Sequence, residues 1–80
     1  MLKVRLNHNA IELAMVRRNM SQNMLATRIG ISSGYISQLM CGNRNASPRV
    51  RQKILDALVP LIFDDVFIIE EDRHGEPTSR

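Results

Sequence analysis

The sequence predicts a mainly α-helical domain of four or five helices, with a small two-stranded antiparallel pair formed by its N- and C-terminal segments. Three observations lead to this fold class. Apolar residues recur at helical spacing through residues 9–58, serines and glycines stand where helices begin and end, and strand-like patterns occur near both chain ends. We expect residues 1–70 to form one domain and residues 71–80, with Gly75 and Pro77, to be a disordered tail.

The two terminal segments have the patterns of short strands. "LKVRL" at 2–6 alternates three apolar residues with two basic ones, which is the period of a half-buried strand. "VFIIE" at 66–70 is rich in β-branched and aromatic residues. Each strand alone would leave an unpaired edge, so we expect them to pair with each other in antiparallel fashion.

Two helices are expected between these strands and residue 30. In the first, over about residues 9–19, Ile11, Ala14 and Met15 share one face. Ser21 has the side chain of an N-cap and begins the second helix, which Gly30 ends because glycine readily adopts positive φ. The buried stripe of the second helix is predicted to be Leu25, Ala26 and Ile29.

Serine and glycine also delimit the later helices. Ser32 is the predicted N-cap of a third helix over about Ser33 to Met40, and Gly42 closes it. After the turn-rich loop "GNRNAS" at 42–47, Ser47 and Pro48 supply a cap and an N1 proline for a fourth helix. Its apolar positions are Val50, Ile54, Ala57 and Leu58, and "LIFDD" at 61–65 is expected to form one further helical turn.

Length and composition indicate a small binding module rather than an enzyme. A chain of 80 residues makes one domain that buries only ~60% of its unfolded surface, which leaves little room for a deep pocket. With 44% hydrophobic and 24% charged residues the chain is globular, and its apolar runs fall short of the ~20 residues of a membrane span. The N-terminus lacks the apolar stretch and cleavage site of a secretion signal, so we expect a cytoplasmic location.

Cysteine and histidine usage predicts neither a disulfide, a metal centre nor a cofactor. Cys41 is the single cysteine and cannot form an internal disulfide. Together with His8 and His74 it lacks the spacing of metal ligands, and no histidine is placed to activate it for catalysis. The core is therefore expected to hold by packing alone.

The net charge of +3 is unevenly distributed along the chain. Residues 1–60 carry nine Lys and Arg against two acids, a net charge of +7, while residues 61–80 carry a net charge of −4. A basic body indicates a polyanionic partner, the alternative being a merely solvated surface. The acids at 64–65 and 70–72 could suggest a metal site, but we interpret them as solvating charge that also keeps a polyanion away from that pole.

The second and third helices form a predicted helix-turn-helix unit over residues 22–41. They are separated only by "GIS", and small Ala26 with Gly30 at the corner allows the two backbones to cross closely. On the third helix Gly34, Ser37 and Gln38 lie opposite Ile36, so its outer face is polar and uncharged. The inside angle is filled by Leu25, Ile29, Ile31, Ile36 and Leu39.

The stretch "MSQNMLATRIGISSGYISQLMCGNRNASPRVRQKILDAL" resembles the Cro/phage-repressor-like, or XRE-like, helix-turn-helix regulators. The shared features are Ser-Gln at the second helix, Gly-Ile-Ser at the turn, Tyr-Ile-Ser-Gln-Leu in the third helix, and a proline-started fourth helix. The resemblance covers about residues 9–67. It implies a DNA-binding domain whose third helix enters the major groove, acting as a homodimer on a two-fold operator.

The resemblance also implies which residues contact DNA. Base contacts fall on Ser33, Gly34, Ser37 and Gln38, and a phosphate contact on Gln22, where a helix N-terminus favours anions. A glutamine pairs with adenine through two hydrogen bonds, worth ~1–3 kcal/mol of discrimination. Backbone contacts are also expected from Tyr35, Asn43, Arg44, Asn45 and Arg49, of which Arg49 is also a candidate for the minor groove.

Several of these residues have a plain structural alternative. Ser33 could act only at the start of the third helix, Tyr35 could pack its ring against the second helix, and Arg44 could belong to a solvated basic loop. Arg28, Arg51 and Lys53 are assigned to general surface charge.

The chain departs from the family at one pair of positions. Members often carry a buried Arg in the first helix paired with a Glu at the end of the third, and the corresponding residues here are Met15 and Met40. Replacing both charges together by apolar groups is physically consistent, because neither is left stranded in the core. We expect the two methionines to touch.

The sequence thus predicts a sequence-specific DNA-binding regulator, most consistent with a repressor of phage, mobile-element or toxin–antitoxin type. The alternative is a module that binds a protein partner, such as a toxin or a recombination factor; no membrane partner is expected. A surplus of apolar residues indicates a homodimer, unless the strand pair and the short helix bury them all. These residues are Leu13, Val16, Leu61, Ile62, Phe63, Phe67, Ile68 and Ile69.

Overall fold

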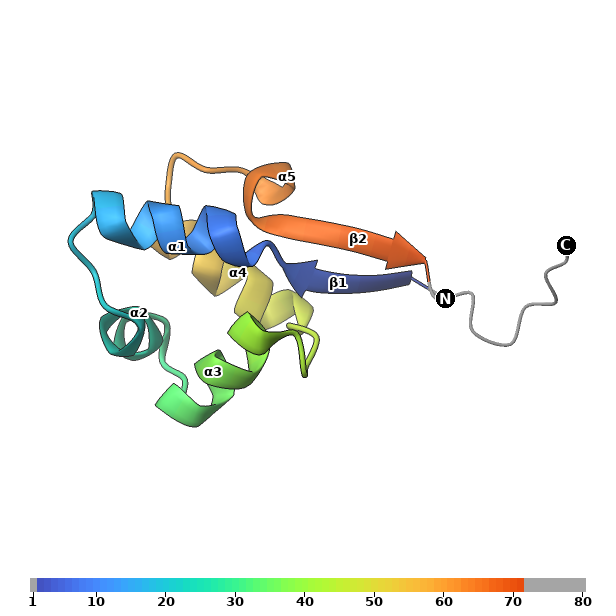
Figure 1. Cartoon of the computed structure of the whole chain (residues 1–80), viewed down its shortest axis with the longest axis horizontal. Coiled ribbons are helices and arrows are strands. Elements are labelled where there is room, and N and C mark those ends of the chain that lie inside the picture. Colours follow the sequence, from blue (N-terminus) through green and yellow to red (C-terminus); the bar gives the residue numbers. More distant parts are fainter. Residues whose placement is uncertain (1, 72–80) are drawn as a thin grey trace, which may run out of the picture.

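A computed structural model describes residues 2–71 of the chain. Figure 1 shows helices that form one body and a two-stranded sheet that projects from its side. This confirms the predicted mainly helical fold class with a terminal strand pair. The remainder of the expected tail, residues 72–80, lies outside the described residues. The elements are β1 (Leu2–Leu6), α1 (His8–Arg17), α2 (Gln22–Ile29), α3 (Ser33–Cys41), α4 (Pro48–Ala57), α5 (Phe63–Val66) and β2 (Phe67–Glu71).

The two strands pair in antiparallel register, with Leu6 opposite Phe67. The predicted strand 66–70 was placed one residue too early, because Val66 ends α5 and Glu71 belongs to β2. The Val66 carbonyl accepts a hydrogen bond from the backbone N–H of Asn7 at 2.8 Å, and the Val66 side chain is fully buried. Asn7 and Val66 continue the register in which Leu6 lies opposite Phe67, but Val66 still belongs to α5, and the backbone becomes extended only at Phe67.

Side-chain caps begin the helices where the serines predicted them. The hydroxyls of Ser21, Ser32 and Ser47 each accept a hydrogen bond from the backbone N–H three residues further along the chain. Asn7 caps α1 in the same way, a role that the sequence reasoning missed although Asn is a preferred N-cap residue. Each cap satisfies an N–H that a helix N-terminus would otherwise leave without a partner.

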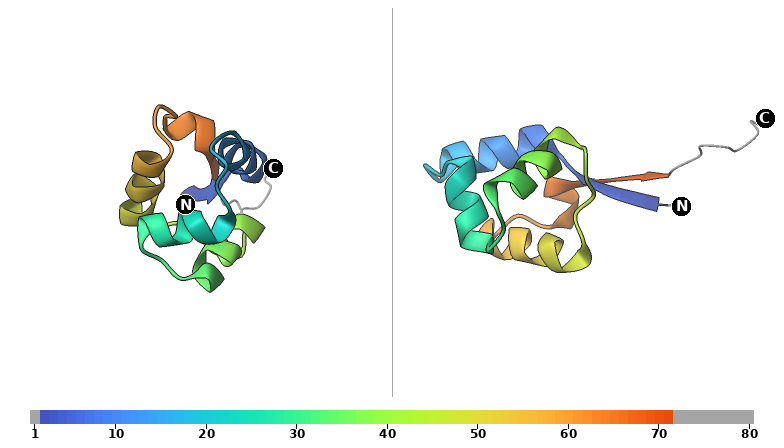
Figure 2. Two further views of the ribbon diagram at one scale, coloured as in Figure 1. Left: turned by 90° about the vertical axis from the view of Figure 1, so that its left-hand side faces the viewer. Right: turned by 90° about the horizontal axis from the view of Figure 1, so that it is seen from below.

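Figure 2 shows the helices arranged around a common centre, and their buried apolar side chains form one core. Ile11, Ile36 and Ile54, from three different helices, are completely buried in it. Met15 and Met40 are both 6% exposed and belong to the same core, although their direct contact stays a prediction. Among residues 2–71 no polar or charged residue is buried, so the core holds by apolar packing.

Arg18 ties α1 to the end of α4. Its guanidinium donates hydrogen bonds to the carbonyls of Ala14 at 3.1 Å, Leu58 at 3.1 Å and Val59 at 2.8 Å. These are the carbonyls that a helix C-terminus leaves without intrahelical donors, and a cation is favourable there. The long side chain thereby fixes the first helix against the segment that follows the fourth.

Candidate nucleic-acid interface

The tight connection between α2 and α3 sets the position of the third helix. Gly30 has φ 79°, and its N–H and that of Ile31 donate to the Ala26 carbonyl at 2.9 and 3.0 Å. This left-handed ending turns the chain sharply, as glycine allows without a Cβ penalty. The turn brings α3 against α2, with Leu25, Ala26, Ile29, Ile36 and Leu39 all buried at the contact and Ile31 half-buried beside it.

The outer face of α3 is formed by small polar residues. Ser33, Gly34, Ser37 and Gln38 are all exposed, as the sequence predicts for the residues expected to contact bases. A Cβ added at Gly34 would have no neighbouring atom within 4 Å, so this part of the helix borders open space. The start of α3 can therefore approach a flat or grooved partner without obstruction.

Gln22 connects the start of α2 to the middle of α3. Its Nε2 donates a hydrogen bond to the Ser37 Oγ at 3.4 Å. Gln22 is the first residue of α2, where free backbone N–H groups and the helix dipole favour an anion. The structure thus brings a predicted phosphate-contacting residue and a predicted base-contacting residue together on one surface.

Tyr35, Gln38 and Arg44 form a second cluster at the other side of α3. The Arg44 Nη1 donates to the Gln38 Oε1 at 3.3 Å, and the guanidinium carbon of Arg44 lies 5.1 Å from the centroid of the Tyr35 ring. Tyr35 is half-buried and packs against the apolar core. Arg44 is exposed but held by both contacts, and is not a free basic side chain.

The remaining predicted residues flank this cluster. Asn43, Asn45 and Arg49 are exposed, and Arg49 lies in the first turn of α4. Arg51, which the sequence reasoning assigned to general surface charge, instead donates to the Ala46 carbonyl at 2.8 Å. Because Ala46 is buried, this hydrogen bond anchors the end of the loop that carries Arg44.

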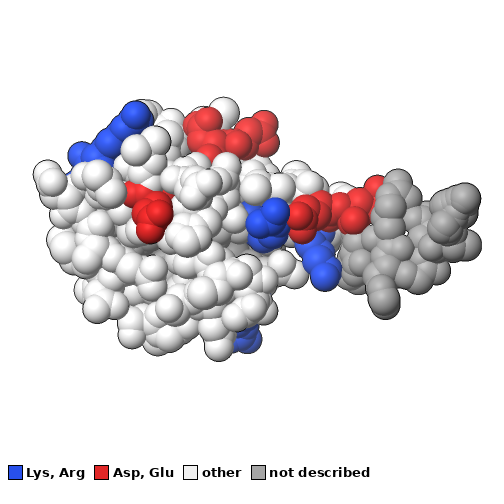
Figure 3. All heavy atoms as spheres, in the orientation of Figure 1, with Lys and Arg blue, Asp and Glu red and all other residues white. Residues whose placement is uncertain are grey.

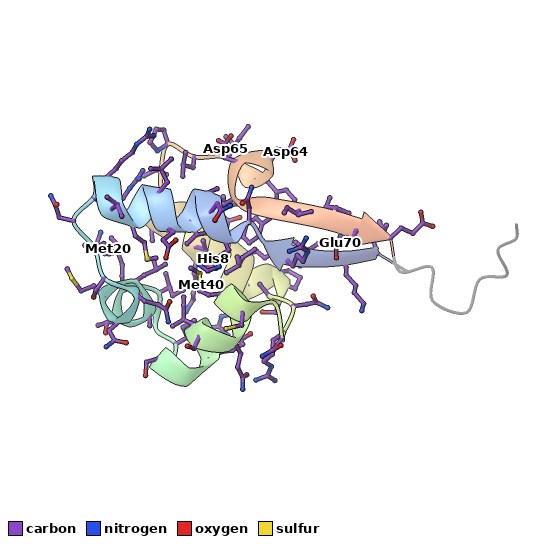
Figure 4. The ribbon with its side chains drawn as sticks, viewed as in Figure 1. His8, Met20, Met40, Asp64, Asp65 and Glu70 are labelled. Carbon is purple, nitrogen blue, oxygen red and sulfur yellow. The ribbon has the colours of Figure 1, made fainter. Side chains whose placement is uncertain are left out.

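Charge separates the α3 side of the molecule from the α5 side. Figure 3 shows acidic groups over α5 and along the sheet, whereas the part of that face formed by α2 and α3 is almost uncharged. Asp64 and Asp65 lie on α5, across the helical body from α3 (Figure 4). The acidic pole therefore points away from the polar face of α3, an arrangement that favours an anionic partner at α3.

Three further observations on residues 2–71 concern metal-binding groups, reactive thiols and membrane-spanning helices. Within residues 2–71 no group of three or more His, Cys, Asp or Glu is placed to hold a metal ion. Cys41 is a free, exposed thiol at the end of α3. Over the same residues no helix has the length and apolar character needed to cross a membrane.

Comparison with known families assigns the fold its class. The helix-turn-helix family model HTH_3 matches residues 11–58, which is more than half of the chain. The chain therefore belongs to this family, the XRE-type helix-turn-helix family of DNA-binding regulators. Neither a curated protein nor a solved structure gives a significant match.

Proposed function

We propose that this protein is a sequence-specific transcriptional repressor of phage, mobile-element or toxin–antitoxin type, which binds a two-fold operator. The observation that carries the proposal is the outer face of α3, with small polar side chains and no charge, flanked by Gln22 on one side and Arg44 on the other. Uncharged polar groups suit base edges, and flanking polar and basic groups suit phosphates.

In this proposal α3 lies in the major groove and binding itself is the mechanism. Ser33, Gly34, Ser37 and Gln38 face the bases, because they share the exposed side of the helix. An occupied operator excludes polymerase or a competing protein. The backbone contacts come from Gln22, Tyr35, Asn43, Arg44, Asn45 and Arg49.

A homodimer is part of the proposal because several large apolar side chains are exposed. Phe67, which the sequence reasoning counted as surplus, is buried, but Leu13, Val16, Ile62 and Ile69 are between 50% and 68% exposed. Exposed apolar groups are typical of protein contact surfaces. We expect sedimentation to show a concentration-dependent dimer, and a constant monomer mass would contradict this part of the proposal.

The same apolar groups support the alternative, a module that binds another protein. Salt dependence separates the two functions, because DNA affinity falls with salt at a slope of about −0.9 per phosphate contacted. An association that is insensitive to salt would favour the protein partner.

Selection from random duplex DNA by the purified chain tests the proposal. We expect an enriched palindrome with half-sites spaced by ~34 Å or a multiple of it. Ser37→Asp places a carboxylate on the outer face of α3 and is expected to abolish binding. Asn9→Asp adds the same charge at an exposed position of α1 and should bind nearly as the parent does. Equal binding by the two variants would contradict the placement of α3.

A further inference from the structure

The hydrogen bond between Arg44 and Gln38 changes what Gln38 offers to DNA. A glutamine recognises adenine by accepting from its N6 amino group through Oε1 while donating to N7 through Nε2. Here the Arg44 Nη1 donates to that Oε1 at 3.3 Å. One of the two lone pairs of the acceptor needed for adenine is therefore engaged, and the oxygen lies beside a permanent positive charge.

The end of α3 places Arg44 in this position. Gly42 has φ 81°, and the N–H of Asn43 donates to the Gln38 carbonyl at 2.9 Å. This helix ending turns the chain back, so that Arg44 returns alongside the last turns of α3. The position of the guanidinium follows from the backbone path as well as from its own side-chain contacts.

The guanidinium of Arg44 lies over the aromatic ring of Tyr35. Tyr35 and Gln38 are three residues apart on α3 and therefore neighbours on one side of the helix. The Arg44 guanidinium carbon is 5.1 Å from the Tyr35 ring centroid, within the range of a cation–π interaction. Because the ring packs against the core, its position is fixed by the fold.

Most of the free hydrogen-bonding groups of the pair are donors. A guanidinium has five N–H groups, of which one is used on Gln38, and the Gln38 Nε2 carries two more. Guanine presents two acceptors in the major groove, O6 and N7, whereas adenine and cytosine each present an amino donor. The pair is thus complementary to guanine, which offers two acceptors where thymine offers only O4, and its charge disfavours the amino groups of adenine and cytosine.

We propose that Gln38 and Arg44 act together as a guanine-reading pair, in which Arg44 contacts the base edge in place of the backbone contact first proposed for it. This rests on the proposed function, in which α3 lies in the major groove. Gln38 is on the exposed face of α3, so the hydrogen bond holds the guanidinium beside the base edges. Arg44 then sets specificity from the loop after the recognition helix.

The test compares the full-length chain with Arg44→Ala on a selected duplex and on the same duplex with one guanine replaced by adenine. We expect selection to enrich guanine at one position of each half-site. In Arg44→Ala the ratio of the two affinities should fall by about 5- to 150-fold at that position only. Arg44→Lys should also lose most of this ratio, because lysine keeps the charge but not the planar fork.

Arg17→Ala is the matched control, since it removes one exposed positive charge from the end of α1. It should leave the guanine-to-adenine ratio unchanged. If Arg44→Ala instead weakens binding to both duplexes equally and lowers the salt slope by about one, Arg44 contacts a phosphate and the inference is wrong, while the proposed function stands. Enrichment of adenine at the position that depends on Arg44 would also overturn it. Without any enriched sequence, the proposed function itself fails.

Discussion

The helix-turn-helix unit and the terminal sheet differ in how their apolar residues are used. In α2 and α3 the apolar residues that face inward, such as Leu25 and Ile36, are at most 6% exposed. In the sheet only the end nearest the helices is buried, with Leu6 and Phe67 both 4% exposed, while Leu2 at the outer end is 66% exposed. Packing therefore fixes the part of the molecule that carries the candidate interface far more firmly than the part that joins the chain ends.

This difference has a physical consequence for where a rigid surface can form. An isolated two-stranded sheet is marginally stable in water, so the β1–β2 pair depends on its contact with the helical core. The outer face of α3 is exposed, but its inner face is locked into that core. A recognition surface can thus be solvent-facing and still well positioned, because the opposite side of the same helix is buried.

The largest expected effect compares two isoleucines, one from each region. Ile36→Ala removes a side chain that is 0% exposed, and we expect the free energy of unfolding to fall by about 2–5 kcal/mol. Ile69→Ala removes one that is 53% exposed in β2 and should cost less than about 1 kcal/mol. Urea unfolding followed by circular dichroism measures both, and equal losses would remove the contrast between the regions.

A pair of glycines tests the backbone of the helix-turn-helix unit. Gly30→Ala forces a Cβ onto φ 79°, and we expect a loss of about 1–2 kcal/mol, although the nearest atom to that Cβ would be 3.7 Å away. Gly34→Ala has open space and helical geometry, so stability should rise by up to ~1 kcal/mol. DNA affinity should nevertheless fall in Gly34→Ala, because the added methyl group would project from the outer face of α3 toward the DNA. Thermal unfolding and DNA titration together check both results.

Substitutions at two adjacent serines are expected to have different effects, one on the stability of the protein and the other on its binding to DNA. The Ser32 hydroxyl caps α3 by accepting from the Tyr35 N–H at 3.0 Å, so Ser32→Ala should cost about 1 kcal/mol of unfolding free energy. Ser33→Ala leaves this capping hydrogen bond in place, so it should not lower the free energy of unfolding, but it removes a predicted base contact. We expect it to unfold as the parent does and to bind the selected DNA more weakly. The reverse result would mean that Ser33 acts at the helix start instead.

The smallest effect is expected at the ion pair of the sheet. Arg5 and Glu70 approach to 2.9 Å, but their side chains are 43% and 47% exposed. Glu70→Gln should therefore lower the free energy of unfolding by about 0.2–1 kcal/mol, and the loss should shrink at high salt. Urea unfolding at low and high salt tests this. A loss as large as that in Ile36→Ala would show the sheet to be more important than its exposure indicates.

Much of the fold could be predicted because its signals are local. Ser21, Ser32 and Ser47 act through hydrogen bonds to residues three positions away, and Gly30 and Gly42 act through their own φ angles. Such effects depend on neighbouring residues alone. The boundary of β2 was predicted less well, because Val66 is a β-branched residue typical of strands and yet ends the short helix α5.

The candidate site likewise has features that the sequence predicts and features that it does not. The exposed positions of α3 follow from helical periodicity, but nothing in the sequence pattern shows that Arg44 would return to Gln38 and Tyr35. Arg51 was assigned to general surface charge but donates to a main-chain carbonyl, and Arg18 makes hydrogen bonds of the same kind. Long basic side chains reach partners that only the path of the chain brings near.

The sequence by itself determined where α2, α3 and α4 begin, the tight turn at Gly30 and the uncharged outer face of α3, because these depend on local hydrogen bonds, backbone angles and periodicity. The tertiary structure alone decided which polar atoms meet. It brought Gln22 within hydrogen-bond distance of Ser37, and Arg44 within hydrogen-bond distance of Gln38. The packing of α2 against α3 sets the first distance, and the turn after α3 sets the second. The hydrogen-bonding character that the interface offers to a base is therefore a property of the fold.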